Sequence, residues 1–489
     1  MSKHATISKH IFLKALECHT KGWFLHHEIG VATSTPAEII RMRQGQEIHR
    51  LARARFPEGV LVGDLKMERA IDRTQEMLHD QNTHVLFEPY LRHGNCVTRG
   101  DILSVQQDGW CLEEVKSSLS QNPGHVDDIA YTTMVMVGAG VEIREVHLTL
   151  VSKNYKHGSD EAPLLWSVDI TSEVLDRAAE FESIRPEIER ALALPHCPLA
   201  VLKWACRGCE FFADQCVGKD MNDPIFEIPR ISVKKFNFLL ERGLTEIGSI
   251  PNDFQLSGTQ RRVVDSVQVG EMWVSERLRE AVNELEWPLF YLDFETVSTC
   301  LPLYDGLGPY TQIPTQYSLH ACREGTGSLE HREYLADGTA DCRRAFAELL
   351  LSDLETQGNI LVYSSFEQSV LTRLQDWFGD IAEPLERIKE RLVDLQAIIK
   401  KYVWHPKFRG STSIKRTLPV LVPEMGYSDL QIANGEHASA AFYNLACGLI
   451  QPSEVASTRE ALLLYCERDT LAMVKLHEAL VNVAIRHQS

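Results

Sequence analysis

The sequence predicts an α/β protein with more than one domain. At 489 residues the chain is longer than one ordinary hydrophobic core, and this length favours two or three domains. Hydrophobic residues make up 44% of it and charged residues 24%, which is typical of globular proteins. Strand-like and helix-like patterns both occur in its first and last parts, so a mixed α/β class is expected.

The expected compartment is the cytoplasm, with no membrane partner. No apolar run approaches the roughly 18–20 residues that a membrane-spanning helix needs. The segment Met1 to Leu16 lacks the apolar core and cleavage site of a signal peptide. In a reducing compartment the twelve cysteines are expected to be buried thiols or metal ligands, not structural disulfides.

The net charge of −18 argues against a protein that coats nucleic acid in general. It does not exclude a nuclease, because catalytic carboxylates add acids while a substrate groove can be locally basic. One segment has cations and no acid, and it contains Lys400, Lys401, Lys407, Arg409, Lys415 and Arg416. Phosphate contact and a solvated surface both remain open for this segment.

The first region, to about residue 220, is expected to mix helices and strands. Residues 36–56 predict a helix, with Pro36 in its first turn and an apolar stripe formed by Ile39, Ile40, Ile48 and Leu51. Two strand-like runs, 96–105 and 110–118, are joined by a turn whose Asp-Gly pair favours a hairpin. Residues 146–152 predict a third strand beside them.

From residue 223 to about 286 the pattern predicts a small helical connector with breaks at Gly243, Pro251 and Gly258. Its segment 239–251 is faintly similar to a helix-hairpin-helix. The last region opens with a buried strand over 289–294 and has a second over 360–363. It closes with a helix from about 458 to 481.

A first group of chemically active side chains lies on the predicted hairpin. Residues two apart in a strand project to the same face, so Glu114 and Lys116 point together while Glu113 points away. Asp101, on the partner strand, can then share a divalent ion with Glu114, and Lys116 can stabilise charge on an attacked phosphate. The alternative is a solvent-facing ladder of charges.

The runs Gly45-Gln46-Glu47-Ile48-His49, Arg99-Gly100-Asp101-Ile102-Leu103 and Glu113-Glu114-Val115-Lys116 resemble the RecB-like branch of the PD-(D/E)xK nucleases. The resemblance implies a restriction-endonuclease-like domain over 1–220. It also implies that His49 joins Asp101 and Glu114 at the metal, with Lys116 as a catalytic residue. Thr132 stands where this family places a Gln.

Cysteines close the first region. Cys206, Cys209 and Cys216 form a CxxC pair and a third thiol, a pattern that suits zinc or an iron–sulfur cluster. Iron–sulfur RecB-like nucleases of the CRISPR-associated and AddB types take one cysteine from the N-terminus and three from after the nuclease core. That resemblance implies a 4Fe–4S cluster on Cys18, Cys206, Cys209 and Cys216. Zinc, unligated thiols, and Cys197 in place of Cys206 remain open.

A second group of acids lies in the last region. The run Phe290 to Thr296 alternates, so Asp293 and Glu295 share one face of a strand whose other face is apolar. Two acids on a buried strand are costly unless a cation neutralises them, which favours a metal site. Tyr465 and Asp469, spaced by four, share one face of the last helix.

A DxE strand followed far downstream by YxxxD resembles the tyrosine-bearing DEDD exonucleases of the RNase H-like fold. The resemblance implies two metal ions held by Asp293, Glu295, Glu367 and Asp469, with Tyr465 orienting the attacking water. Glu367 follows the short strand at 360–363, where the family usually has Asp. Asp394 is a possible substitute or outer partner.

The two resemblances together are similar to a little-characterised bacterial family that fuses both modules. They imply a nuclease domain over 1–220, a connector over 221–286 and an exonuclease domain over 287–489. The expected function is a Mg²⁺- or Mn²⁺-dependent DNA exonuclease that prefers single strands, with 3′–5′ activity in the C-terminal module. RNA processing and a nucleic-acid-binding scaffold with a degenerate site are the alternatives.

Overall fold

The computed structural model describes residues 6–30, 34–63, 65–323 and 328–487, and these form two compact units. Unit 1 comprises 1–201, 208–212 and 299–311; unit 2 comprises 202–207, 213–298 and 312–489. The connector residues therefore group with the last region of the chain. Among the described helices, none combines the length and apolar character needed to cross a membrane.

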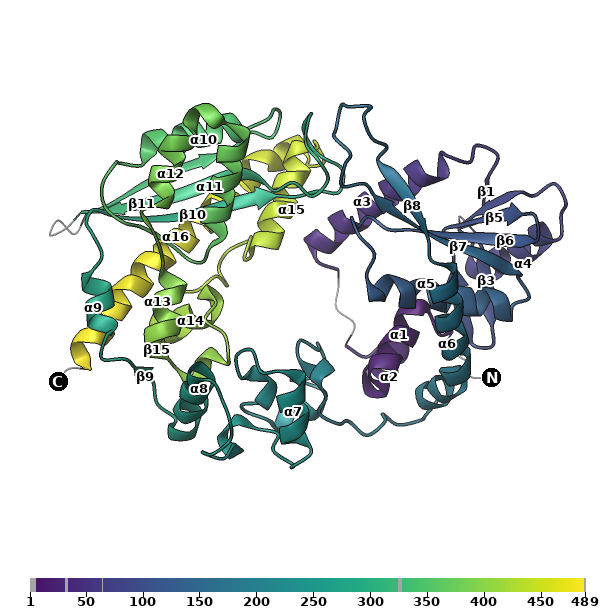
Figure 1. The fold of residues 1–489 in the computed structure, drawn as a ribbon, viewed down its shortest axis with the longest axis horizontal. Coiled ribbons are helices and arrows are strands. Elements are labelled where there is room, and N and C mark those ends of the chain that lie inside the picture. Colours follow the sequence, from purple (N-terminus) through teal and green to yellow (C-terminus); the bar gives the residue numbers. More distant parts are fainter. Residues whose placement is uncertain (1–5, 31–33, 64, 324–327, 488–489) are drawn as a thin grey trace. The chain divides into compact units, whose positions relative to one another are not determined.

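Unit 1 is built on a six-stranded mixed sheet in the order β1-β2-β5-β6-β7-β8 (Figure 1). Its strands are β1 (Val60–Leu61), β2 (Val85–Phe87), β5 (Ile102–Gln106), β6 (Gly109–Val115), β7 (Ile143–Val151) and β8 (Leu165–Asp169). The β5–β6 hairpin is antiparallel and β7 runs parallel to β6 on its other side. The structure therefore contains the predicted hairpin, as β5 and β6, and the predicted third strand beside it, as β7.

The helices of unit 1 are α1 (Lys9–Glu17), α2 (His19–His26), α3 (Pro36–Arg53), α4 (Met67–Leu78), α5 (Pro123–Gly138) and α6 (Thr171–Leu192). Helix α3 starts at Pro36 as predicted, because Thr35 and Glu38 form a capping box there. It ends at Arg53, three residues before the predicted end. Ile39 is 52% exposed, so the prediction that it belongs to the buried stripe is wrong, whereas Ile40 and Ile48 are buried.

The predicted strand 96–105 is wrong as a single element. Its first part, β4 (Cys96–Arg99), pairs with β3 (Tyr90–His93) in a separate two-stranded sheet, and its second part is β5. The chain changes sheets at Gly100 and Asp101. The carbonyl of Asp101 accepts the Glu88 N–H and its carboxylate accepts the Val115 N–H, which hold this bend in place. Asp101 consequently lies outside the ladder, at the start of β5.

Unit 2 is built on a five-stranded sheet in the order β12-β11-β10-β13-β14. Its strands are β10 (Leu289–Val297), β11 (Ile313–Cys322), β12 (Leu329–Leu335), β13 (Ile360–Val362) and β14 (Leu392–Asp394). Strands β10, β11 and β12 are antiparallel neighbours, whereas β13 and β14 run parallel to β10. The central strand β10 and its parallel neighbour β13 confirm the predicted strands at 289–294 and 360–363.

Helices cover both faces of this sheet (Figure 1). Phe290, Leu292 and Phe294 pack against α10 (Arg343–Asp353), α11 (Phe366–Trp377) and α12 (Ala382–Lys389). The opposite face packs against α9 (Leu278–Asn283), α13 (Leu395–Tyr402) and the long helix α16 (Val455–Arg486), which extends the predicted 458–481 helix.

The remaining helices of unit 2 are α7 (Val233–Leu240), α8 (Gly258–Val269), α14 (Ile414–Leu421) and α15 (Gly435–Ala446). The helical character predicted for 223–286 is confirmed, and Gly258 starts α8. The region 223–286 also contains one short strand that was not predicted, β9 (Trp273–Val274), which pairs with β15 (Val403–Trp404).

Candidate active sites

The strongest candidate site lies on β10 in unit 2. Side chains alternate along this strand, so Phe290, Leu292 and Phe294 point into the hydrophobic core on one face of the sheet. Asp293 and Glu295 point to the opposite face. Oxygen atoms of Asp293, Glu295 and Asp469 lie within 4.8 Å of one another. The structure thus brings together three of the acids that the sequence selected.

Helix α16 supplies Asp469 and positions the groups around it. Tyr465 lies one turn earlier and contacts Asp469 through its hydroxyl. The Tyr427 hydroxyl donates to Asp469 Oδ1 over 2.5 Å. The Cys466 thiol donates to Asp293 Oδ2 over 3.5 Å, so the helix also fixes the strand carboxylate. Sequence analysis did not select Tyr427 or Cys466, because nothing in their local pattern indicates a partner so distant in sequence.

Burial and mutual repulsion make these carboxylates reluctant to ionise. Burial, followed by the charge of Asp469, raises the pKa of Glu295 to about 8 and that of Asp293 well above its usual range. The Lys415 ammonium lowers the pKa of Glu295 and Asp469, although burial still leaves both raised. A divalent cation would favour the ionised forms far more than one remote ammonium group does.

Glu367 lies in the first turn of α11 and is 2% exposed. Its Oε2 atom has no hydrogen-bond partner among the described residues. Burial is the main cause that raises the pKa of Glu367 to about 8, and the charges of Asp394 and Asp469 add to it, whereas backbone N–H groups oppose it. Asp394 itself caps α13 by accepting the Ala397 N–H. A buried carboxylate oxygen without a partner is the state expected of a cation ligand.

The donor set fits a hard divalent ion. Asp293, Glu295, Asp469 and Glu367 offer only carboxylate oxygens, which Mg²⁺ and Mn²⁺ prefer. In the described part of the chain, no lysine or arginine forms an ion pair with any of the four. The raised pKa values of the four acids therefore leave their neutralisation to bound protons or to a bound cation.

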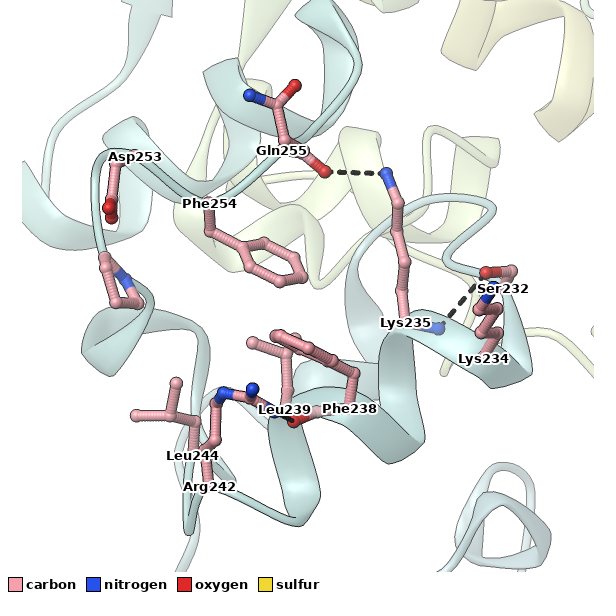
Figure 2. A pocket seen from close by; sticks show the side chains of 11 residues that line it. Ser232, Lys234, Lys235, Phe238, Leu239, Arg242, Leu244, Asp253, Phe254 and Gln255 are labelled. Carbon is pink, nitrogen blue, oxygen red and sulfur yellow. Dashed lines mark hydrogen bonds between the residues drawn. The ribbon is translucent and has the colours of Figure 1, made fainter.

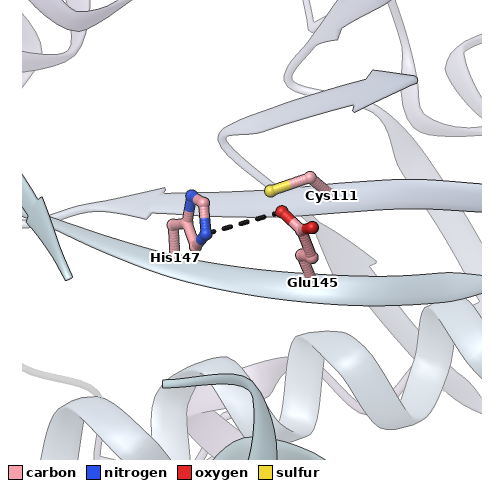
Figure 3. Close-up of side chains that lie close together, drawn as sticks. All are labelled: Cys111, Glu145 and His147. Atoms are coloured by element: carbon pink, nitrogen blue, oxygen red, sulfur yellow. Dashed lines mark ion pairs between the residues drawn. The ribbon is translucent and has the colours of Figure 1, made fainter. Parts of the chain in front are cut away.

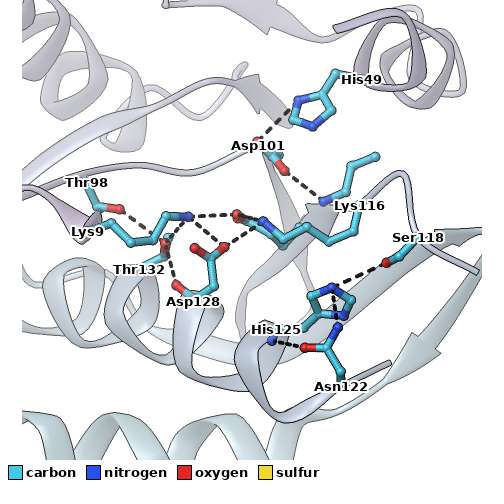
Figure 4. Close-up of polar contacts among 12 residues, drawn as sticks. Lys9, His49, Thr98, Asp101, Lys116, Ser118, Asn122, His125, Asp128 and Thr132 are labelled. Atoms are coloured by element: carbon cyan, nitrogen blue, oxygen red, sulfur yellow. Dashed lines mark hydrogen bonds and ion pairs between the residues drawn. The ribbon is translucent and has the colours of Figure 1, made fainter. Parts of the chain in front are cut away.

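The candidate site of unit 1 is organised differently (Figure 4). Glu114 is 2% exposed, and its Oε1 atom accepts from Lys9 Nζ at 2.9 Å and from Lys116 Nζ at 3.0 Å. Both ammonium groups also reach Asp128 Oδ2, at 2.9 and 2.6 Å. Burial would raise the pKa of Glu114, but Lys116 and Lys9 hold it well below its usual range.

His49 and Asp101 lie beside this network. His49 Nδ1 is 3.5 Å from Asp101 Oδ1, and the Val115 N–H donates to Asp101 Oδ2 over 2.8 Å. Burial, followed by the charge of Glu114, raises the pKa of Asp101 to about 6. The four residues that the sequence selected, His49, Asp101, Glu114 and Lys116, are thus neighbours in the fold.

Lys9 and Asp128 also belong to this site, although neither was among its predicted residues. Asp128 precedes Thr132 by one helical turn on α5, so the two side chains face the same way. This spacing could have identified Asp128 from the sequence. Lys9 Nζ lies 3.4 Å from Thr132 Oγ1. Lys9 lies 105 positions from Glu114, and no local pattern connects them. Lys9 and Lys116 thus share Glu114 Oε1, while Glu114 Oε2 is buried without a hydrogen-bond partner among the described residues.

The cysteines selected for a cluster are shared between the units: Cys18 and Cys209 belong to unit 1, Cys206 and Cys216 to unit 2. Each unit by itself therefore supplies two of the four thiols, and the 4Fe–4S cluster stays a prediction. Two further groups of metal-binding side chains occur among the described residues. One is Cys111, Glu145 and His147 on β6 and β7 (Figure 3), and the other is His320, His331 and Glu467.

The first group mixes a thiol, a carboxylate and an imidazole, and the second has two imidazoles and a carboxylate. Burial raises the pKa of the Cys111 thiol to about 12, which disfavours the thiolate that binds metal. The rings of His320 and His331 are stacked with centroids 4.5 Å apart, and ligand atoms of both residues and of Glu467 lie within 4.8 Å of one another.

Comparisons with known proteins match the region of the unit 2 site to an uncharacterised domain. Residues 290–413, which include Asp293, Glu295 and Glu367, match a family described as a domain of unknown function, DUF2779. The chain is 23% identical over 223 residues to the uncharacterized protein MG366 homolog of Mycoplasma pneumoniae, covering 42% of this chain and 33% of that protein.

Two further relatives are similar at the same level. The chain is 22% identical over 232 residues to the uncharacterized protein MG366 of Mycoplasma genitalium, covering 42% of this chain and 35% of that protein. It is 24% identical over 211 residues to the uncharacterized protein UU173 of Ureaplasma parvum, covering 38% and 30%. The chain thus spans about a third of the length of the curated relatives it matches.

Proposed function

We propose that this protein is a metal-dependent nuclease whose unit 2 carboxylates hydrolyse phosphodiester bonds in a nucleic-acid strand. The observation that carries the proposal is that oxygen atoms of Asp293 and Glu295 on β10 and of Asp469 on α16 lie within 4.8 Å of one another. Acids so close together repel one another unless cations neutralise them. The resemblance of β10 and α16 to the DEDD exonucleases gives those cations a chemical role.

The side chains have separable tasks in this proposal. Asp293, Glu295 and Asp469 would hold a divalent ion, and Glu367 would complete the set from the neighbouring helix. When bound, the ion supplies a Lewis acid for a phosphoryl oxygen and makes a bound water more acidic. Tyr465 orients the water by its hydroxyl, and that position beside Asp469 supports the role.

The unit 1 site is a second candidate nuclease centre. The grouping of His49, Asp101, Glu114 and Lys116 supports the RecB-like interpretation. Thr132, which stands where the family places a Gln, favours the alternative for this half, a nucleic-acid-binding scaffold without turnover. Within unit 2 the substrate can be DNA or RNA, and single-stranded DNA remains our first choice.

Incubation of the protein with strands labelled at the 5′ end, in Mg²⁺ or Mn²⁺, tests the proposal. The Lys116→Ala background silences the unit 1 site, and parallel DNA and RNA strands decide the polymer. We expect a descending ladder that starts from the 3′ end and disappears in Asp293→Asn. Internal cuts on a circular single strand, or degradation from the 5′ end, would show that unit 2 is another class of enzyme.

A further inference from the structure

Unit 2 contains a cavity of about 640 Å³ between α7 and the loop 251–255 (Figure 2). Two aromatic rings, Phe238 and Phe254, line this cavity. Its lining also contains three cations, Lys234, Lys235 and Arg242, and several apolar side chains. Asp253 is the one acid among its described lining residues, so cations are in excess. The volume lies in the range of small-molecule and nucleotide pockets. The cavity belongs to the connector region and is separate from the carboxylate site.

The aromatic groups of this cavity are arranged as a stacking surface. Phe238 is 41% exposed, although a phenylalanine is normally buried. The Arg242 guanidinium lies 3.4 Å from the centroid of the Phe238 ring, and the Phe254 ring is 5.8 Å from it on a tilted plane. Exposed aromatic rings and planar guanidinium groups are the surfaces on which proteins stack unpaired bases.

A second cavity, of about 600 Å³, adjoins the first because Ser232 and Lys235 line both. Its cations are Arg207, Arg230, Lys235 and Lys400, and no Asp or Glu is among the described residues that line it. In a chain with net charge −18 this is a marked local excess of positive charge. Hydroxyls of Ser257 and Thr259, which accept hydrogen bonds from Gln260 and Arg262, add donors that suit phosphate oxygens.

One short chain segment connects the lining of the second cavity with neighbours of the carboxylates. Thr412 lines it, and the carbonyl of Thr412 accepts a hydrogen bond from the Tyr363 hydroxyl at the end of β13. Three residues later, Lys415 lies 5.9 Å from the ring of Tyr427, which donates to Asp469. Three residues of chain span at most about 11 Å. One segment therefore joins the cationic cavity to the site.

We propose that these two cavities form a groove that binds a single nucleic-acid strand and guides it to the carboxylate site. A base stacks on Phe238 and Arg242, while phosphates lie along Lys234, Lys235, Arg230 and Lys400. This inference rests on the proposed nuclease function and names how its substrate is held. It also gives the basic run at 400–416 a role, because Lys400 and Thr412 belong to the groove.

Binding can be measured without turnover, by fluorescence anisotropy of labelled poly-dT and poly-U on the Asp293→Asn protein in EDTA. Phe238→Ala should weaken binding of either strand by about fivefold or more, the usual effect of removing one stacking platform. Lys234→Glu should weaken binding and reduce the slope of log affinity against log salt by about 0.7 for each phosphate that is no longer neutralised.

Phe238→Tyr, which keeps an aromatic ring at this position, should bind both strands as tightly as the unsubstituted protein. Trp166→Ala and Lys475→Glu, which alter an exposed aromatic and an exposed cation elsewhere, are the matched controls.

Kinetics separates the groove from the catalytic site. On active protein, Phe238→Ala should raise KM for a long strand more than it lowers kcat, whereas Trp166→Ala should change neither. The groove proposal is rejected if Phe238→Ala and Lys234→Glu leave binding unchanged, or if the control variants weaken binding as much as they do. Groove-dependent binding without any cleavage would instead retain the groove and reject the proposed nuclease function.

Discussion

The Tyr427 hydroxyl donates a 2.5 Å hydrogen bond to Asp469 Oδ1, joining two residues 42 positions apart. The bond orients one carboxylate of the candidate metal site, and its donor, Tyr427, is not itself one of the four acids. Partners of this kind orient metal ligands, and their removal typically costs about 10–100-fold in metal affinity or activity. Tyr427 is therefore a positioning residue in our interpretation.

Tyr427→Phe should increase the Mg²⁺ concentration needed for half-maximal activity by about 10–100-fold, with a smaller reduction of activity at saturating metal. The reason is that Asp469 keeps its charge but loses its orientation. A metal titration of strand cleavage measures the effect. Tyr402→Phe, a partly buried tyrosine in the same unit, should behave as wild type. An unchanged metal requirement for Tyr427→Phe would contradict the positioning role.

The acids of unit 2 should differ in their tolerance of substitution. Asp293→Asn or Asp469→Asn should lower kcat by at least about a hundredfold, the scale of removing one main transition-state stabiliser. Tyr465→Phe should cost less, because it removes orientation and no charge. Glu367→Asp should be tolerated, whereas Glu367→Gln should not be. Asp429→Asn, an exposed acid paired with Arg468, serves as the control; an equal reduction there would point to a general structural effect.

Stability without metal should fall as the pH rises. The folded-state pKa of Glu295 and of Glu367 is about 8, above the usual 4.5. Their protonated forms stabilise the fold below about pH 4.5, and this stability is lost as the pH rises toward 8. Each group can contribute a slope of up to about 1.4 kcal/mol per pH unit. Mg²⁺ should oppose the destabilisation, since it binds the ionised forms.

Calorimetry at several pH values, with EDTA or with Mg²⁺, would measure this dependence. The unit 2 transition should shift by about 2–4 °C for each kcal/mol. Glu295→Gln should flatten the EDTA curve, because the neutral amide does not ionise. A Tm in EDTA that rises between pH 5 and 8 would mean that the carboxylates are stabilised as charged groups in another way.

The two sites should act independently. Lys116→Ala should remove activity of unit 1 and spare unit 2, and Asp293→Ala should do the reverse, because each site would hold its own metal. Strand cleavage assayed for both single variants and the double variant decides this. If Lys116→Ala leaves activity unchanged, unit 1 is the non-catalytic scaffold that Thr132, in place of the family's Gln, favours.

Anaerobically purified protein should be brown, because cysteine-ligated iron and sulfide absorb broadly in the visible region. Cys209→Ser should bleach the colour and lower the stability of the N-terminal region, whereas Cys447→Ser should keep both. Metal analysis completes the test. Colourless protein that contains stoichiometric zinc would reject the iron–sulfur cluster.

Local sequence determined much of this protein. Strand alternation placed Asp293 and Glu295 on the face opposite Phe290, and helical spacing placed Tyr465 beside Asp469. Pro36 and its neighbouring cap determined where α3 begins. These features depend on residues within a few positions of one another, so a single sequence contains them.

Tertiary structure alone decided the rest. The sheet change at Gly100 and Asp101, the contact of Lys9 with Glu114, and the approach of Tyr427 to Asp469 join residues whose separation leaves no periodic signal. Such contacts result from the packing of whole element faces against one another. The packing of α16 against β10 brings Tyr465 and Asp469 to the strand acids, and the packing of α1 brings Lys9 to Glu114. Local periodicity specifies which face of an element is buried, but only packing specifies which distant side chain meets it.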